Sequence, residues 1–123
     1  MGKPRVLSID DSKSVHAFLK LCLVDKVSSF DVVFNGKEGV ERLRRGPNDF
    51  DVIFLDWEMP ELDGPATFFE LKKIGVTTPV FMLTSKNDPA DMEKMLDAGV
   101  ADYILKPYTP DIIQFKLRSI LAA

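Results

Sequence analysis

The sequence is nearly free of cysteine and has no long apolar run. Cys22 is the only cysteine, so no internal disulfide can form, which fits the reducing cytoplasm. We expect this thiol to be a small buried apolar group. No stretch approaches the roughly 20 apolar residues of a membrane-spanning helix, and the N-terminus lacks the apolar segment of a signal peptide. We therefore expect a cytoplasmic protein with no membrane insertion.

The chain also lacks an excess of positive charge. It has 16 Lys and Arg residues against 19 Asp and Glu residues, a net charge of -3 and a pI of about 5.1. Nucleic-acid-binding surfaces are usually basic, so we expect no nucleic-acid partner. The chain is 46% hydrophobic and 28% charged, which is typical of globular proteins. Its 123 residues suit one domain that buries a core without disulfides.

Five short apolar runs alternate with five amphipathic helical patterns. Strict alternation predicts an α/β fold, with a doubly wound parallel sheet and helices on both faces. Right-handed crossovers favour the flavodoxin-like strand order 2-1-3-4-5. The expected strands cover residues 5–9, 30–34, 52–56, 79–83 and 103–105, and the helices end near Val24, Gly46, Gly75, Gly99 and the C-terminus.

Helix starts are marked by capping residues. Asp11 and Ser12 are both candidates for the first cap, and Asp88 with Pro89 is expected to open the fourth helix. Asn35-Gly36 could close a hairpin, but the helical pattern that follows predicts a loop into a helix. Asp63-Gly64 is typical of a turn before the third helix.

Polar residues stand where the apolar runs end. Asp10 and Asp11 follow the first run, Asp56 ends the third, Thr84 follows the fourth and Lys106 follows the fifth. In the predicted order the first and third strands are neighbours, and ligands bind at the carboxyl ends of such strands. We therefore expect three carboxylates to converge beside a hydroxyl and an ammonium group. The alternative is that Asp56 only ends its strand or caps the next segment.

The chemistry of such a cluster narrows its function. Three neighbouring carboxylates raise one another's pKa unless a cation relieves the repulsion. An oxygen-only ligand set with room for water and phosphate oxygens suits Mg²⁺. Lysine can hold a phosphoryl oxygen, a threonine hydroxyl can donate to another, and a carboxylate can form an acyl phosphate. The set predicts a phosphorylatable aspartate with its metal.

These residues, in this order, resemble the receiver domain of two-component response regulators. The resemblance covers residues 5–121 and includes Met59-Pro60, Asp63-Gly64, Ala98-Gly99 and the Lys106-Pro107 pair. It implies that Asp56 accepts a phosphoryl group from a sensor histidine kinase or a histidine phosphotransfer protein. A single-domain switch over residues 1–123, with no output domain, is the expected organisation.

The resemblance also implies a Mg²⁺ site and a switch. Asp11 and Asp56 are expected to bind Mg²⁺ directly, Asp10 through water, and Glu58 through its backbone carbonyl. Thr84 and Lys106 are expected to hold the phosphoryl group, and Tyr103 to swing inward as Thr84 moves. Pro107 is expected to follow a cis peptide bond, which proline makes accessible. Tyr103 could instead be a plain core aromatic residue.

Two charged positions flank the expected phosphoryl site. Glu58 lies two residues after Asp56, and Lys86 lies two residues after Thr84. We hypothesise that they pair across the mouth of the site and tune the phosphoryl lifetime by partly gating water; the alternative is two solvated loop residues. The lone histidine, His16, is expected to be an ordinary surface or core residue, with a partner contact as the alternative.

The expected function is a phosphorylation-activated switch, as in chemotaxis regulators or phosphorelay intermediates. It is not expected to be an enzyme beyond self-catalysed phosphoryl transfer and autodephosphorylation at Asp56. The resemblance places the readout to a downstream protein on the fourth helix, fifth strand and last helix. Alternatives are a fragment of a longer, for example DNA-binding, regulator and a Mg²⁺-dependent phosphatase, for which no cap insertion is visible. A nucleotide- or flavin-binding module would need a Gly- or Ser-rich phosphate loop.

Overall fold

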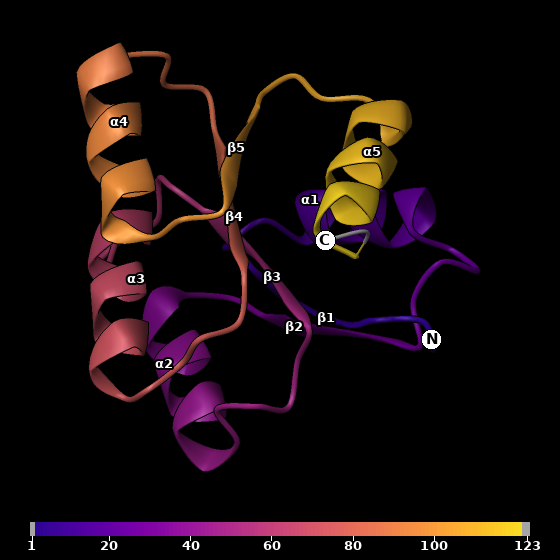
Figure 1. Ribbon diagram of the computed structural model, residues 1–123, viewed down its shortest axis with the longest axis horizontal. Helices are drawn as coiled ribbons and strands as arrows, with labels where there is room; N and C mark the ends of the chain where they lie inside the picture. Colours follow the sequence, from indigo (N-terminus) through magenta and orange to yellow (C-terminus); the bar gives the residue numbers. More distant parts are fainter. Residues whose placement is uncertain (1, 122–123) are drawn as a thin grey trace.

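A computed structural model describes residues 2–121 as a parallel sheet between two layers of helices (Figure 1). The strands are β1 (Arg5–Ile9), β2 (Ser29–Val33), β3 (Val52–Asp56), β4 (Val80–Thr84) and β5 (Asp102–Leu105). The helices are α1 (Lys13–Cys22), α2 (Gly36–Arg45), α3 (Gly64–Lys73), α4 (Pro89–Ala98) and α5 (Pro110–Leu121). The strand order is β2-β1-β3-β4-β5, which confirms the predicted topology.

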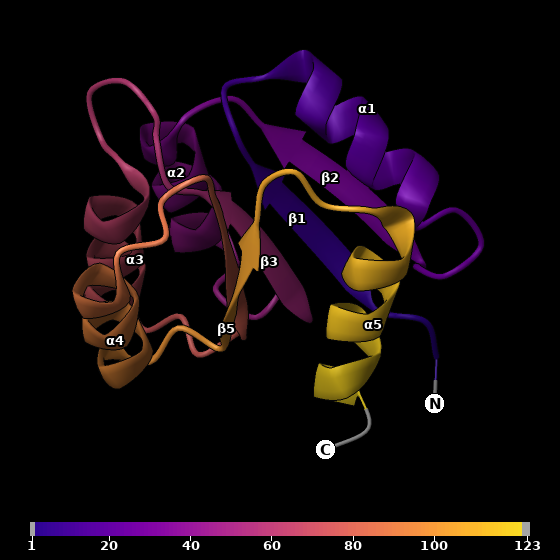
Figure 2. The ribbon, with the colours of Figure 1, turned by 90° about the horizontal axis from the view of Figure 1, so that it is seen from above.

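The two helical layers bury opposite faces of every central strand. Helices α1 and α5 cover one face, whereas α2, α3 and α4 cover the other (Figure 2). Neighbouring side chains of β3 therefore go to different cores: Ile53 and Leu55 join the α2–α4 side, and Val52 and Phe54 join the α1–α5 side. Because both faces are covered, β3 is buried along its whole length, and its sequence is an apolar run from Val52 to Leu55 that ends in Asp56.

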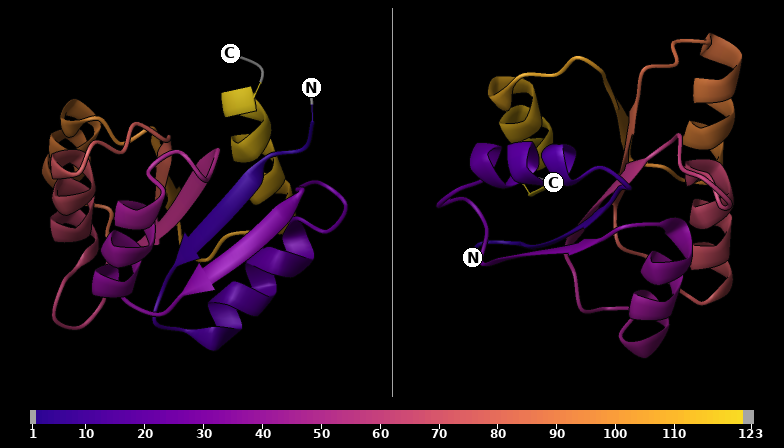
Figure 3. Two further views of the ribbon diagram at one scale, coloured as in Figure 1. Left: turned by 90° about the horizontal axis from the view of Figure 1, so that it is seen from below. Right: turned by 180° about the vertical axis from the view of Figure 1, so that it is seen from behind.

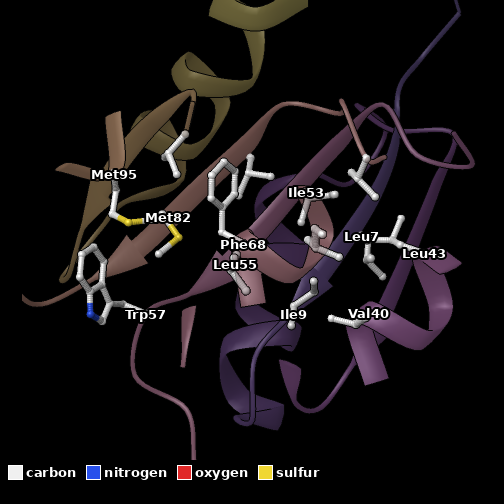
Figure 4. Close-up of a cluster of buried hydrophobic side chains, with 14 of the residues drawn as sticks. Leu7, Ile9, Val40, Leu43, Ile53, Leu55, Trp57, Phe68, Met82 and Met95 are labelled. Carbon is white, nitrogen blue, oxygen red and sulfur yellow. The ribbon is translucent and has the colours of Figure 1, made fainter. Parts of the chain in front are cut away.

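The larger core packs the sheet against α2, α3 and α4 (Figure 4). Leu7 and Ile9 of β1 lie next to Val40 and Leu43 of α2 in this view. Farther along the sheet, the same cluster contains Phe68, Met82, Met95 and Trp57. Burying a large apolar side chain stabilises a fold by about 1.5–3 kcal/mol, so this cluster holds the sheet and its loops in place.

Helix starts follow the capping rules, and the ends of the elements shift slightly from the predicted ones. Ser12 rather than Asp11 caps α1, because its hydroxyl accepts the Val15 N–H. Asn35 caps α2 through the Glu38 N–H and so begins a helix, as predicted, instead of closing a hairpin. The observed β2 begins and ends one residue earlier than expected. Within residues 2–121, no helix has the length and apolarity needed to span a membrane.

Candidate functional site

The strands bring their carboxyl ends to one edge of the sheet, because all the neighbouring pairs are parallel (Figure 3). Each chain segment is anchored to its neighbour as it leaves its strand. The Trp57 N–H donates to the Leu83 carbonyl at 2.9 Å, and the Lys106 N–H donates to the Thr84 carbonyl at 2.8 Å. The polar residues that end β3 and β4, and those that follow β1 and β5, therefore start from neighbouring points of the same edge.

Three carboxylates meet at this edge, as the sequence predicts. Asp10, Asp11 and Asp56 each offer an oxygen, and these atoms all lie within 4.8 Å of one another. Asp10 and Asp56 are buried, whereas Asp11 is exposed. Asp10 Oδ1 accepts the Ser12 N–H at 2.9 Å, but Asp10 Oδ2 is buried with no hydrogen-bond partner among residues 2–121. An all-oxygen cluster with an unpaired buried carboxylate oxygen fits a hard divalent cation.

Lys106 is the cation that the chain itself supplies. Its Nζ lies 2.8 Å from Asp56 Oδ1, and the Asp56 side chain is only 4% exposed. Burial lowers the pKa of Lys106, but the hydrogen bond and charge of Asp56, together with Asp10 and Glu58, outweigh it and raise that pKa. Burial raises the pKa of Asp56, and the bond to Lys106 offsets only part of this rise. Lys106 therefore stays charged, and its Nζ binds one oxygen of a cluster in which the carboxylates repel one another.

Asp10 is the carboxylate of the cluster whose pKa is raised most, so its charged form is the most unfavourable. Burial raises its pKa to about 6; the Ser12 N–H opposes this rise, and the charge of Asp56 adds to it. Lys106 lowers the pKa of Asp10 less than burial raises it. Near neutral pH the cluster thus carries more negative charge than its own partners neutralise, which favours a bound cation.

The predicted pair between Glu58 and Lys86 is wrong for this structure. Lys86 Nζ lies over the Trp57 indole, 5.8 Å from the ring centroid. Glu58 instead accepts hydrogen bonds from the Thr84 hydroxyl at 3.3 Å and the Ser85 hydroxyl at 3.5 Å. Each side chain has other partners within reach: the lysine makes a cation–π contact, and the carboxylate accepts from two donors at the end of β4.

Thr84 is fully buried and is oriented by two partners. Its hydroxyl donates to Glu58 and accepts the Lys86 N–H at 2.9 Å. The hydroxyl proton is therefore directed at the Glu58 carboxylate.

Trp57 links the site to α4. Its indole stacks on the Tyr103 ring with a centroid separation of 6.0 Å and an interplanar angle of 30°. Tyr103 is 5% exposed, and its hydroxyl donates to the Met92 carbonyl at 3.0 Å and lies 3.3 Å from the Asp91 carbonyl. The ring therefore points inward, and its hydroxyl is hydrogen-bonded to the backbone of α4.

Gly64 has a different role from the turn that the Asp63-Gly64 pair suggests. A Cβ at this position would lie 2.6 Å from the Asp56 carbonyl oxygen and 2.7 Å from the Trp57 Cα. The Gly64 N–H donates to the Trp57 carbonyl at 2.7 Å. Glycine is needed because the start of α3 touches the backbone of the residues that form the site.

Two further sequence expectations have clear structural outcomes. The Lys106-Pro107 peptide bond is cis, as predicted. His16 is buried and bonded to the end of β1, so it is a core residue and its side chain does not face a partner. Its contacts with Ser8 and with the Asp10 carbonyl were not predicted, because they join residues on two elements and leave no spacing signal in the sequence.

Comparison with known proteins identifies the family. The response regulator receiver domain profile matches residues 6–118. This chain belongs to the receiver domains of two-component response regulators. The transcriptional regulatory protein DltR of Streptococcus agalactiae is 32% identical over 93% of the chain, and the probable transcriptional regulator ycf27 of Porphyridium aerugineum is 35% identical over 98%. The chain spans about half the length of these two relatives.

Solved structures support the same family and fold. The receiver domain of the Francisella response regulator 1452 is 32% identical, with a TM-score of 0.86 and 98% coverage of both chains. The chemotaxis protein CheY4 of Vibrio cholerae has a TM-score of 0.85 at 24% identity, with 97% of this chain and 99% of that chain covered. The second likeness concerns the fold alone.

Proposed function

We propose that this chain is a phosphorylation switch in which Asp56 accepts a phosphoryl group from a phosphohistidine. The observation that carries the proposal is the meeting of Asp10, Asp11 and Asp56 within 4.8 Å, with Lys106 Nζ 2.8 Å from Asp56. A buried carboxylate at the end of a rigid central strand is a well-placed nucleophile. The adjacent lysine supplies fixed positive charge for a phosphoryl group.

The proposed reaction needs no external oxidant or reductant. An unprotonated oxygen of Asp56 attacks the phosphorus of phosphohistidine, the new P–O bond forms, and the P–N bond breaks. The imidazole nitrogen keeps the bonding electron pair and takes a proton from solvent. In hydrolysis, a water oxygen attacks the same phosphorus and the acyl P–O bond breaks. Inorganic phosphate leaves, and Asp56 returns as a carboxylate.

The acidic cluster fits Mg²⁺ as the cofactor of this step. We propose that Asp11 and Asp56 hold the ion directly, that Asp10 holds it through water, and that the Glu58 backbone carbonyl completes the protein ligands. Bound Mg²⁺ would supply charge for the phosphoryl oxygens. The unpaired Oδ2 of buried Asp10 supports a cation at this place.

The same proposal gives a role to Thr84 and Tyr103. A phosphoryl oxygen at Asp56 takes the Thr84 hydroxyl away from Glu58, so the end of β4 moves toward Asp56. Trp57 is hydrogen-bonded to Leu83 of β4 and stacks on Tyr103, which donates to the Met92 carbonyl of α4. Phosphorylation would thereby bias the position of α4, a local charge change with a wider readout.

Incubation with Mg²⁺ and the small donor acetyl phosphate tests the proposal. We expect one phosphoryl group per chain by intact mass, together with a change in the fluorescence of Trp57, the only tryptophan. EDTA should prevent both changes. Absence of both the adduct and a response to the metal would show that the acidic cluster is structural, and release of phosphate over many turnovers from unrelated esters would favour a phosphatase.

Glu58→Asn and Lys86→Ala test the tuning of the phosphoryl lifetime. Glu58 contacts Thr84 and Lys86 lies over Trp57, so each side chain would shield Asp56 from attacking water, and we expect each variant to speed dephosphorylation. An effect of about tenfold corresponds to roughly 1.4 kcal/mol of barrier. Loss of the phosphoryl group with time, followed by mass, measures this rate. If both variants keep the wild-type rate, these residues do not gate water.

Two surface features support protein partners. An open apolar groove of about 320 Å³ lies beside Lys106 and is lined by Val15, Phe18 and Tyr108 among others. We propose that it receives the sensor histidine kinase or histidine phosphotransfer protein in the cytoplasm. The downstream target would bind α4, β5 and α5, where Leu105 and Phe115 are exposed.

A further inference from the structure

The only histidine joins α1 to the end of β1. His16 is 5% exposed, its Nδ1 lies 2.9 Å from Ser8 Oγ, and its Nε2 lies 2.9 Å from the Asp10 carbonyl oxygen. The ring also meets the edge of Phe34, with centroids 5.0 Å apart and an interplanar angle of 86°. Both nitrogens of this buried imidazole are thus hydrogen-bonded, and Nε2 is bonded to the backbone carbonyl of Asp10.

The hydrogen bonds define the state of the ring. A carbonyl oxygen can only accept, so Nε2 carries a proton and donates it to Asp10. In the neutral ring, Nδ1 then accepts the hydroxyl proton of Ser8, which is fully buried on β1. The orientation of the imidazole is therefore fixed from both sides.

The Asp10 carbonyl needs this partner because of where it lies. β1 ends at Ile9, and the Asp10 N–H makes the last contact with the neighbouring strand, to the Val33 carbonyl at 3.2 Å. The next peptide group joins Asp10 to Asp11, the two acidic residues of the cluster that come from β1. A buried carbonyl without a donor is unfavourable. The hydrogen bond from His16 Nε2 satisfies this carbonyl and so favours one orientation of the peptide group.

We propose that His16 is a positioning residue for the divalent cation: it fixes the Asp10–Asp11 peptide and so the direction of both carboxylates. The inference rests on the proposed function, because it assumes that the acidic cluster binds Mg²⁺. His16 touches neither the ion nor the phosphoryl group. It acts on them through the Asp10 backbone, as groups that orient metal ligands commonly do.

Four variants separate positioning from packing. His16→Phe removes both hydrogen bonds and keeps a buried ring. His16→Gln can place an amide N–H near the Nε2 position and keep the bond to Asp10, whereas His16→Asn can reach only the Nδ1 side. Ser8→Ala removes the other partner and leaves the bond between His16 and Asp10 in place. Each variant keeps Trp57, so its fluorescence reports Mg²⁺ binding without a phosphoryl donor.

We expect Mg²⁺ to bind about tenfold more weakly to His16→Phe and His16→Asn than to wild type. His16→Gln should restore most of the affinity, and Ser8→Ala should keep it. Melting temperatures in EDTA measure the effect on packing separately. Equal affinities for His16→Gln and His16→Asn, or a loss in Ser8→Ala as large as in His16→Phe, would overturn the inference. If wild type itself gave no response to Mg²⁺, the proposed function would fail, and the inference with it.

Discussion

The Asp56→Asn variant is expected to gain no phosphoryl group from acetyl phosphate in the presence of Mg²⁺. An amide is not a nucleophile of this kind, and within residues 2–121 no other carboxylate lies both at the end of the buried β3 and beside Lys106 Nζ. The fluorescence change of Trp57 that follows phosphorylation should disappear as well. Intact mass after incubation with the donor measures the first effect, and emission spectra measure the second.

Asp31→Asn is the matched control for this experiment. Asp31 is an exposed residue of the edge strand β2, and the substitution makes the same change in charge. It should keep wild-type phosphorylation. Melting temperatures of both variants would show that they fold. A phosphoryl group on Asp56→Asn at the wild-type rate would place the acceptor on another residue and refute the proposed role of Asp56.

In EDTA, the protein is expected to become less stable as the pH rises from about 4 to about 6. The folded protein raises the pKa of Asp10 from 3.8 to about 6, chiefly by burial, so in this range the folded state binds the proton more tightly than the unfolded state. Stability therefore falls as this proton is lost, and the cost is complete above pH 6. One pKa unit is about 1.4 kcal/mol, so the charged Asp10 costs roughly 3 kcal/mol at pH 7.

Asp10→Asn should remove most of this cost. In EDTA at pH 7 we expect the variant to be more stable than wild type, and its loss of stability between pH 4 and 6 should be smaller. A slope should remain, because burial raises the pKa of Asp56 as well. Urea unfolding at several pH values measures the free energy, with Asp31→Asn as the control for charge alone. An unchanged slope and an unchanged stability at pH 7 would show that Asp10 carries no such cost.

Mg²⁺ should make wild type more stable than Asp10→Asn, the reverse of the order expected in EDTA. A cation that binds the folded state stabilises it by mass action, and it offsets the repulsion among the three carboxylates. Wild type should therefore gain more stability from Mg²⁺ than Asp10→Asn does. The acidic cluster is thus expected to lower the stability of the metal-free protein and, in return, to bind the cation.

The architecture and the convergence of the site could be predicted because both follow from local patterns. Alternating strands and helices specify a parallel sheet, and its strand ends must share one edge. Asp10, Asp56, Thr84 and Lys106 each follow a recognisable apolar run, so their meeting needs no knowledge of side-chain packing. The same reasoning gave the strand order.

The interactions that could not be predicted depend on which of several nearby partners a side chain contacts in the folded protein. Lys86 could reach either Glu58 or Trp57, and sequence spacing does not decide between a carboxylate and an aromatic face. His16 has helical spacing typical of a core residue, but nothing in that spacing reveals that its Nε2 meets the Asp10 carbonyl. The need for Gly64 arises from close approach of α3 to β3, which only the packed structure shows.

The central position of β3 has a consequence for the phosphoryl group that we propose on Asp56. β1 and β4 flank this strand, and its side chains are buried on both faces, whereas β2 and β5 form the edges. Edge strands can open and exchange their amide protons through local fluctuations, whereas a central strand tends to open only when the whole domain unfolds. In the proposed switch, a phosphoryl group on Asp56 would therefore be carried by the strand that opens last. The proposed readout would pass to β5, which lies at the edge of the sheet, and to α4.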